Sequence, residues 1–444
     1  MAFGWASVNY SVGSSDKLLS GGKHIELVPA VHDAQSEKYS FAISPETVTL
    51  AKGVRAISNR WAILFVLFFA RTTMAFQFQA VAALSPLIAE DYGITFADIG
   101  LLIGLYLAPG VFVAIPGGVI AARFGDKRVV SFSMVLMLIG SALIGWGPSW
   151  ETLIVGRILA GTGGVILNIV MTKMLVDWFV DHEISTAMAI FINSWPVGIA
   201  LALLTLPNLA AIGGLELAWG TVLVVIALGL IMFVLVYRVP ENAIKSAVRI
   251  EVGKLPLLAL FLAAIVWALY NTAFAMVFSF GPAFFSQSGW DLAAASSVTS
   301  IFIISTAISL PLGGIIADRT GRRDAVIMVS LLGYTILMPL LLYVPVWAAM
   351  PIFVVVGLLF GLGAGPIVTL PSLILQPQAR AFGMGVFYSV YYGLMMAAPT
   401  FAGALADRAG NIGVAFVLGA VMLVIAMVAL GFFRSAGTAP HIAA

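Results

Sequence analysis

The stretch Pro311–Arg323 reads PLGGIIADRTGRR, and it indicates which class of fold the chain adopts. An apolar run ends there in two glycines, one aspartate and three arginines. Glycines let a neighbouring helix approach closely, a carboxylate can accept hydrogen bonds from the free N–H groups of a helix start, and arginines favour headgroup water. We interpret the stretch as a membrane helix that ends at a cytoplasmic loop, with Asp318 as a latch. The alternative is a positive anchor that only determines topology.

The same layout occurs a second time at Gly117–Arg128, which reads GGVIAARFGDKR. Gly118 and Gly314 lie 196 residues apart (314 − 118), as do Gly125 and Gly321 (321 − 125). The spacing recurs in three further pairs: Pro86 and Pro282, Gly93 and Gly289, and Phe191 and Phe387. One half-molecule therefore occurs twice in the same order. We expect two halves that superpose at this spacing about a two-fold axis along the membrane normal.

The motif of a small residue, Asp-Arg, Gly and a basic pair resembles the loop signature of the major facilitator superfamily of secondary transporters, over roughly Trp61 to Arg434. The copy that contains Asp318 matches fully, whereas the first copy has Ala122 in place of the aspartate; GALADRAG, at Gly403–Gly410, is a third, partial copy. The resemblance implies two six-helix bundles that rock about a central site. The gating residues that we expect are Gly118, Arg128, Gly314, Asp318, Arg319, Arg322 and Arg380.

The two latches are expected to differ. Asp318 should lie against the start of the fifth helix near Ser185. In the other half, Arg380 and backbone groups should make the contact that Ala122 cannot make.

The composition independently favours an all-α membrane protein. Of the 444 residues, 61% are hydrophobic and 9% are charged, so a water-soluble domain would have nowhere to place its apolar surface. A net charge of +2 does not indicate nucleic acid, and the absence of cysteine excludes disulfides and thiolate metal sites. The spans lack the acid, base and metal-binding groups of an enzyme. We expect no cofactor or metal, no nucleic-acid partner, and a monomer in the lipid bilayer.

The apolar runs predict twelve spans of about 20 residues, the length that crosses the hydrocarbon core. They lie near residues 61–84, 97–121, 129–147, 151–175, 185–209, 216–237, 255–281, 292–317, 325–343, 346–372, 380–405 and 412–433. The predicted regions are a tail (1–58), a first bundle (59–237), a linker (238–254), a second bundle (255–434) and a short tail (435–444). Residues 45–58 read either as a helix on the membrane surface or as part of a disordered leader. Lysine and arginine concentrate in alternate loops, which predicts a multi-pass protein of the inner membrane with both termini in the cytoplasm.

Arg71 is the most informative charge within the spans. It lies ten residues into the first span, about 15 Å deep at ~1.5 Å per residue, where an arginine costs between ~2.5 and ~17 kcal/mol. Thr72, Thr73 and Gln77 can satisfy only some of its five donors, so we expect a substrate anion to complete them. The alternative is a structural arginine bonded to backbone carbonyls.

The remaining candidates are polar or aromatic residues in the spans. Arg157 lies in the fourth span, nearer the outer surface, so it either faces the pathway or extends to the headgroups. No Asp or Glu lies near the midplane, which makes the predicted pathway net positive and favours an anionic substrate. For each aromatic residue, packing between helices is the alternative role. The predicted substrate-binding residues are Arg71, Gln77, Arg157, Asn193, Trp195, Tyr270, Asn271, Tyr388, Tyr391 and Tyr392.

Three functions remain open from the sequence. An arginine in the first span and the SWPVG of the fifth resemble the cyanate porters and related organic-anion transporters of the superfamily, which implies transport of a small organic anion. The alternatives are an exporter of drug-like amphiphiles and a membrane sensor that does not transport. With no acid or histidine at the midplane, anion exchange or passage down the substrate gradient is as well supported as proton symport.

Overall fold

The computed structural model describes residues 45–114, 123–179, 183–240, 256–375 and 380–437. Its internal contacts divide the chain into two units, Met1–Ile57 and Ser58–Ala444. The described residues of the first unit form the beginning of α1 (Pro45–Ala83). Proline suits the first turn of a helix because its missing N–H would be unpaired there anyway. A position on the membrane surface for residues 45–58 stays a prediction.

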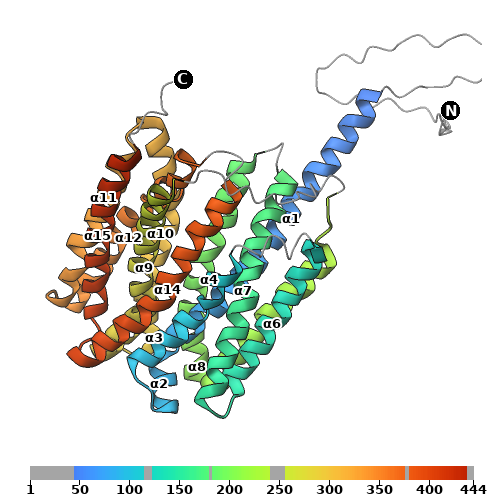
Figure 1. Ribbon diagram of the computed structural model, residues 1–444. Coiled ribbons are helices and arrows are strands. Elements are labelled where there is room, and N and C mark those ends of the chain that lie inside the picture. The colour runs from blue at the N-terminus through green and yellow to red at the C-terminus, as the bar shows by residue number, and fades with distance from the viewer. Residues whose placement is uncertain (1–44, 115–122, 180–182, 241–255, 376–379, 438–444) are drawn as a thin grey trace, which may run out of the picture. The chain divides into compact units, whose positions relative to one another are not determined.

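In the first half of the second unit, every described element is a helix (Figure 1). A capping box of Thr95 and Asp98 begins the second predicted span, and Pro109 in the first turn restarts the helix after a break. After the remainder of α1, the elements are α2 (Ser85–Tyr92), α3 (Phe96–Leu105), α4 (Ala108–Val113), α6 (Asp126–Trp146), α7 (Trp150–Phe179) and α8 (Ile184–Val236).

The second half repeats this plan with more irregular ends. Its 3-10 helices η1, η2 and η3 flank the ninth and tenth predicted spans. The elements are α9 (Leu257–Gln287), α10 (Leu292–Thr320), α11 (Arg323–Leu337), η1 (Pro339–Leu342), η2 (Val346–Ala348), α12 (Ala349–Gly361), α13 (Ala364–Val368), η3 (Leu370–Leu373), α14 (Arg380–Ala409) and α15 (Val414–Gly437).

The helices agree with twelve membrane spans. Ten helices of the described residues are long and apolar enough to cross a membrane. One of them, α8, contains two predicted spans, because its backbone leaves the helical conformation at Gly213 and Gly214. The 30-residue α14 is not among these ten helices, but it covers the eleventh predicted span, so described helices lie at all twelve predicted spans. The predicted all-α membrane fold is therefore confirmed.

The backbone confirms the internal repeat. The described glycines with positive φ form three pairs 196 residues apart: Gly93 and Gly289, Gly125 and Gly321, and Gly214 and Gly410. A positive φ strains residues that carry a Cβ, so glycine meets the same backbone requirement at the same loop of each half. The sequence identified the first two pairs, and the structure adds the third.

The contacts between the halves follow the same repeat. α3 packs on α14 (Figure 1), and α10 packs on α8. The starts of α3 and α10, at Phe96 and Leu292, are themselves 196 residues apart (292 − 96), so the two contacts are equivalent. Two equivalent contacts are what a two-fold arrangement requires, although the axis itself stays a prediction.

Glycines bring α3 and α14 into backbone contact. A Cβ at Gly100 would overlap the carbonyl group of Pro399, and one at Gly104 would overlap the carbonyl of Met396. From the other helix, a Cβ at Gly403 would overlap the carbonyl of Phe96. Small residues at a helix contact are the usual means of close packing within a membrane.

Candidate functional site

A cavity of about 230 Å³ is enclosed by helices of both halves. The first half contributes α1, α7, α8 and the break between α3 and α4, and the second contributes α9, α10, α12, α13 and α14. The residues that line it are Arg71, Met74, Tyr106, Leu107, Gly164, Val165, Asn168, Ile192, Trp195, Pro196, Trp267, Tyr270, Asn271, Phe274, Thr306, Leu310, Phe360, Ala364, Gly365, Val368, Tyr388, Tyr391 and Tyr392. This lining contains no Asp or Glu among the described residues.

Many residues of the cavity lining occur in pairs 196 positions apart, which is the spacing of the internal repeat. Seven residues of the first half have a partner 196 positions later that lines the same cavity. The pairs are Arg71 and Trp267, Met74 and Tyr270, Gly164 and Phe360, Asn168 and Ala364, Ile192 and Tyr388, Trp195 and Tyr391, and Pro196 and Tyr392. The cavity is therefore formed by the same backbone positions of the two halves, with different side chains.

Arg71 is the cation of this cavity, and the protein holds one side of its guanidinium. Its Nε donates to Asn168 Oδ1 at 2.8 Å, and its Nη1 donates to Ser194 Oγ at 2.9 Å. Nη1 also donates to the carbonyls of Phe191 and Ile192, each at 3.0 Å. Within the described residues, Nη2 donates no hydrogen bond. The arginine is thus oriented by the protein while part of its donor capacity remains available.

The sequence named the wrong internal partners for Arg71. Thr72 and Thr73 donate to carbonyls of their own helix, those of Phe68 and Ala70, both at 2.9 Å. Adjacent helical residues face different directions, and threonine hydroxyls readily bond the preceding turn. The actual partners come from α7 and α8, and Asn168 carried no sequence signal other than its polarity within an apolar span.

Arg157 and Gln77 lie outside the cavity lining, contrary to the expectation. Arg157 is completely buried, and its Nε and Nη2 donate to the carbonyls of Leu102 and Phe78 at 2.8 and 2.9 Å. Its guanidinium carbon lies 4.7 Å from the centre of the Tyr106 ring. Arg157 is thus held by carbonyls of α3 and α1, and in this structure it neither lines the cavity nor extends to the headgroups.

Gln77 and Asn193 also differ from the predicted lining. Gln77 is buried, and its Nε2 donates to the carbonyl of Met137 at 2.7 Å and to Ser141 Oγ at 2.6 Å. Asn193 is half-buried on α8, and its Oδ1 is buried without a hydrogen bond within the described residues. Neither side chain belongs to the cavity lining.

The other six predicted binding residues line the cavity together. They are Trp195, Tyr270, Asn271, Tyr388, Tyr391 and Tyr392. The three tyrosines of α14 all line the cavity, and the rings of Tyr391 and Tyr392 lie 4.9 Å apart. The sequence missed Trp267, whose ring lies 6.3 Å from that of Tyr391. Its repeat spacing from Arg71, 196 residues (267 − 71), was the signal that could have identified it.

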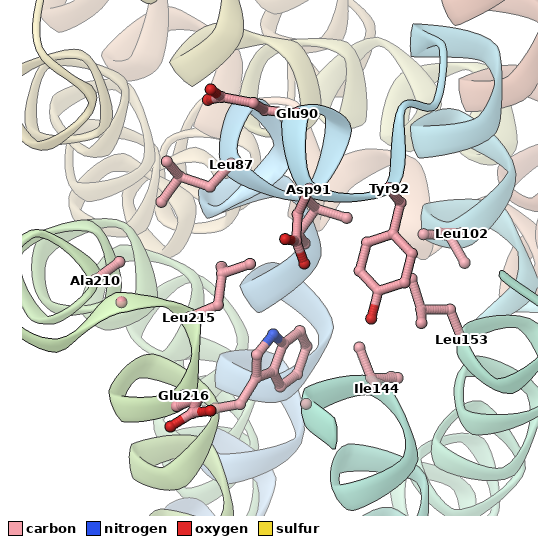
Figure 2. A pocket seen from close by; sticks show the side chains of 14 residues that line it. Leu87, Glu90, Asp91, Tyr92, Leu102, Ile144, Leu153, Ala210, Leu215 and Glu216 are labelled. Carbon is pink, nitrogen blue, oxygen red and sulfur yellow. The ribbon is translucent and has the colours of Figure 1, made fainter. Parts of the chain in front are cut away.

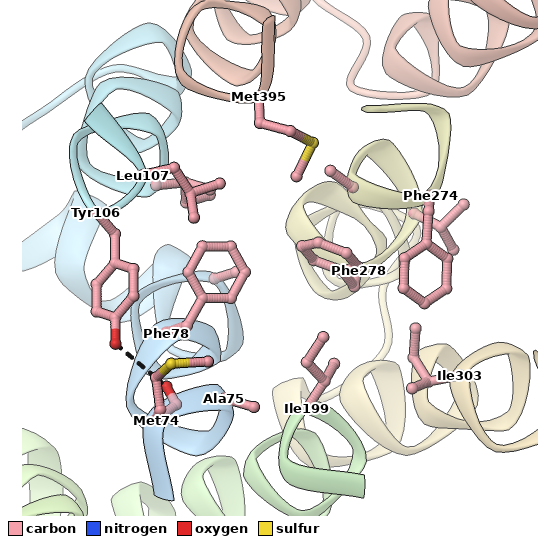
Figure 3. Close-up of a cluster of buried hydrophobic side chains, with 14 of the residues drawn as sticks. Met74, Ala75, Phe78, Tyr106, Leu107, Ile199, Phe274, Phe278, Ile303 and Met395 are labelled. Carbon is pink, nitrogen blue, oxygen red and sulfur yellow. Dashed lines mark hydrogen bonds between the residues drawn. The ribbon is translucent and has the colours of Figure 1, made fainter. Parts of the chain in front are cut away.

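Figure 3 shows a cluster of buried hydrophobic side chains, which we call the plug. On α1, α8, α9 and α14, the plug residues Phe78, Ile199, Phe278 and Met395 come after the cavity residues along each helix, whereas Leu107 and Phe274 belong to both the plug and the lining. The plug consists of Phe78, Leu107, Ile199, Phe274, Phe278, Ile303 and Met395, all buried. Three pairs in it are again 196 apart: Phe78 and Phe274, Leu107 and Ile303, and Ile199 and Met395.

Polar contacts also join the two halves on this side of the cavity. Asp407 of α14 accepts hydrogen bonds from the backbone N–H groups of Phe96 and Ala97 at 3.1 and 2.9 Å. Gln79 Nε2 donates to the carbonyl of Phe278 at 2.7 Å. We call this side the Asp407 end. Asp407 was absent from the predicted gating residues, although the partial motif GALADRAG pointed to it.

We call the opposite side the Asp318 end, and the latch contact predicted there, between Asp318 and the helix start near Ser185, stays a prediction. Asp318 is exposed and makes no hydrogen bond or ion pair within the described residues. Arg128, Arg319 and Arg322 are exposed as well, and Gly314 has no atom within 4 Å of where its Cβ would lie. Gly118, Ala122 and the side chains of Ser185 and Arg380 lie outside the described residues.

A second cavity, of about 670 Å³, lies within the first half at the Asp407 end (Figure 2). Glu90, Asp91 and Glu216 give it a negative lining, with Tyr92 and hydrophobic residues completing the wall. Burial, and secondly the Asp91 carboxylate, raise the pKa of Tyr92, so this phenol stays neutral at physiological pH. The negative lining does not suit an anionic ligand.

Comparisons with known proteins agree with this architecture. The family model of the Major Facilitator Superfamily matches residues 63–296 and 257–443. A bacterial homologue of the human lysosomal transporter Spinster, in an inward-facing and occupied conformation, has a similar fold, with a TM-score of 0.66 and 17% identity over 85% of this chain and 97% of that one.

Among curated proteins, the chain is similar to transporters with different named substrates. It is 22% identical to the hexuronate transporter of Bacillus subtilis over 59% of this chain, and 30% identical to the efflux pump DEP3 of Alternaria brassicicola over 35%. It is also 29% identical to probable anion transporter 2, chloroplastic, of Oryza sativa over 27% of this chain. The matches span 65%, 27% and 23% of these relatives, less than two thirds of each. With the family model matched along almost the whole second unit and helices at all twelve predicted spans, this chain belongs to the Major Facilitator Superfamily of membrane transporters.

Proposed function

We propose that this protein is a secondary transporter that moves a small organic anion by alternating access. The observation that carries the proposal is the position of Arg71, in the wall of a cavity between the halves, with Nη2 free of hydrogen bonds within the described residues. A buried guanidinium is stabilised most by a planar anion that accepts from its free side. The absence of Asp and Glu from the described lining leaves that role to the substrate.

The structure corresponds to one state of the proposed cycle. The plug and the contacts of Asp407 close one end, and Asp318 at the other end is unpaired within the described residues. We assign the Asp318 end to the cytoplasm, because arginines concentrate in its loops. On this assignment the state is closed to the outside, both termini are cytoplasmic, and residues 59–237 and 255–434 are the rocking bundles.

The test is substrate binding and flux with variants of Arg71. Purified protein in detergent is titrated with a panel of sodium carboxylates by calorimetry, and the best ligand is assayed for flux into liposomes with and without a pH gradient. Arg71→Ala should abolish binding while the protein stays folded. Arg71→Lys should weaken binding by about tenfold or more, because lysine keeps the charge but loses the planar fork of donors.

Arg238→Ala is the matched control, because Arg238 is exposed and belongs neither to the cavity lining nor to the expected gating residues. It removes the same charge and should leave the dissociation constant unchanged. Wild-type affinity and flux in Arg71→Ala would make Arg71 structural and would remove the main support for an anionic substrate.

An exporter of amphiphiles is the second candidate, and the apolar part of the lining favours it. Met74, Leu107, Phe274 and Leu310 all contribute apolar surface to the cavity. This function predicts that neutral or cationic amphiphiles bind, and that their affinity survives Arg71→Ala. The same titrations therefore distinguish the two candidates.

A further inference from the structure

We propose that the substrate is a small monocarboxylate with an aromatic body, held between the guanidinium of Arg71 and the rings of the second half. This inference rests on the proposed function and specifies the substrate class of the same site. It follows from three features of the cavity: it has one accessible cation, several of its polar side chains are already hydrogen-bonded within the protein, and both of its walls have donors without a partner.

The cavity offers one cation to a ligand. Arg71 is the only cation in the described lining, and Arg157, the other arginine deep in the first bundle, is enclosed by carbonyl groups. A second carboxylate would enter this apolar cavity without a partner, which costs far more than a single paired one. The cavity therefore favours a monoanion over a dicarboxylate.

Four polar side chains of the lining donate to internal partners, whereas the hydroxyls of Tyr388 and Tyr391 donate no hydrogen bond within the described residues. Tyr270 donates its hydroxyl to the carbonyl of Phe360 at 2.7 Å, and Tyr106 donates to Gln77 Oε1 at 3.1 Å. Asn271 and Thr306 donate to carbonyls of their own helices, each at 2.8 Å. A polyhydroxylated substrate such as a sugar acid carries more hydroxyl groups than these two tyrosines can pair, and each unpaired hydroxyl would cost free energy on burial.

The aromatic rings of the second half pack on one another and give that wall an apolar, aromatic surface. Tyr270 and Phe360 stack with centroids 4.1 Å apart and an interplanar angle of 1°, and Trp267 stacks with Tyr270 at 5.9 Å. Trp195 faces them from the first half of the same lining. A flat apolar body gains burial and ring contacts from such walls.

Trp267 also has a donor that the protein leaves unused. Its Nε1 is buried and has no hydrogen-bond acceptor within the described residues. Trp267 occupies the repeat position of Arg71, and both side chains line the cavity. The first half thus contributes the free side of Arg71, and the second contributes Trp267 together with the hydroxyls of Tyr388 and Tyr391, which donate no hydrogen bond within the described residues; a carboxylate has two oxygens to accept from such donors.

The experiment measures dissociation constants by calorimetry for the wild-type protein in detergent. The probes are benzoate, acetate, succinate, glucuronate and the neutral benzyl alcohol. Benzoate should bind at least about tenfold more tightly than each of the others. Trp267→Phe keeps the ring and removes the N–H, and should weaken benzoate binding several-fold. Trp347→Phe is the control, because Trp347 is 76% exposed.

The outcomes separate this inference from the proposed function. If glucuronate, succinate or acetate binds as tightly as benzoate, and Arg71→Ala abolishes that binding, the aromatic monocarboxylate is overturned while the anion transporter stands. If benzyl alcohol equals benzoate and Arg71→Ala has no effect, both proposals fail. If benzoate is preferred but Trp267→Phe binds it with wild-type affinity, the part assigned to the indole N–H is overturned.

Discussion

The two walls of the central cavity use the same backbone positions for different purposes. In the first half these positions hold Arg71 and Asn168, which provide charge and its support, whereas the second half has Trp267 and Ala364 there. On α8 and α14 the polar residue is in the second half instead, because Ile192 of α8 corresponds to Tyr388 of α14 in the repeat. A duplication preserves helix geometry while the side chains diverge, so a ligand can meet a polar wall and an aromatic wall at once.

The largest effect is expected from moving the cation to the other wall. In Arg71→Ala combined with Trp267→Arg, the cavity keeps one arginine but loses its supports, since Asn168 and Ser194 correspond to Ala364 and Val390 in the second half. We expect carboxylate binding to fall by about 100-fold or more, as in Arg71→Ala alone. Calorimetric titration of both variants checks this. Recovery of wild-type affinity in the double variant would mean that the two walls are interchangeable.

A second comparison contrasts buried positions outside the cavity. Arg157 in the first half corresponds to Phe353 in the second, which is buried 5.6 Å from the ring of Phe285. At this position the first half is therefore held by hydrogen bonds, and the second half by contacts between aromatic rings.

Arg157→Met should lower the stability of the protein by about 2–4 kcal/mol, because it leaves buried carbonyls without donors. Phe353→Ala, the matched variant, should cost about 3–5 kcal/mol through the cavity that it creates. Thermal unfolding in detergent measures both. The dissociation constant of folded Arg157→Met for the carboxylate should equal that of the wild type. A loss of binding without a loss of stability would show that Arg157 takes part in substrate binding.

The smallest effect concerns the two helix starts at the Asp407 end. The start of α10 is capped by its own Asp291, whose carboxylate accepts from Ala294 N at 2.9 Å. The equivalent start of α3 has Thr95 as its cap, in a capping box with Asp98, and it also donates to Asp407 across the interface between the halves. Among the described residues, the helix start therefore bonds a carboxylate of the opposite half only at α3, and we expect this contact to favour closure.

Asp407→Asn should shift the population towards opening at this end by about tenfold, because a charge-assisted contact becomes a neutral one. The chain has no cysteine, so Glu90→Cys and Ser288→Cys provide two specific sites for spin labels, one on each half. Their distance distribution should gain a longer component in Asp407→Asn. Asp318→Asn should leave this distance unchanged; equal distributions in all three proteins would show that Asp407 has no part in closure.

The sequence predicted the fold because its signals are local and repeated. Apolar runs of about 20 residues indicate helices that cross a bilayer. Paired glycines such as Gly125 and Gly321 mark the same loop in both halves. The superfamily and the all-helical architecture followed from these patterns. The sequence also identified Arg71 as a candidate binding residue, because an arginine at that depth in a membrane is costly unless it has a partner.

The functional site was predicted only in part. Seven of the ten predicted binding residues line the cavity, namely Arg71, Trp195, Tyr270, Asn271, Tyr388, Tyr391 and Tyr392. Gln77, Arg157 and Asn193 do not, because polarity within a span does not reveal which neighbour a side chain meets. Asp407 was overlooked for the same reason, since its partners, the N–H groups of Phe96 and Ala97, lie some 310 positions away along the chain.

The sequence by itself thus determined the membrane class, the duplication and the depth of the one arginine that needs a partner, because these depend on composition, spacing and length. Only the tertiary structure decided that Arg71 is supported by Asn168 and that Arg157 is enclosed by carbonyls, and it alone placed Trp267 in the wall with an unpaired N–H. Hydrogen bonds and ring contacts between helices depend on how each helix is rotated about its axis, and that rotation is set by packing against distant segments of the chain.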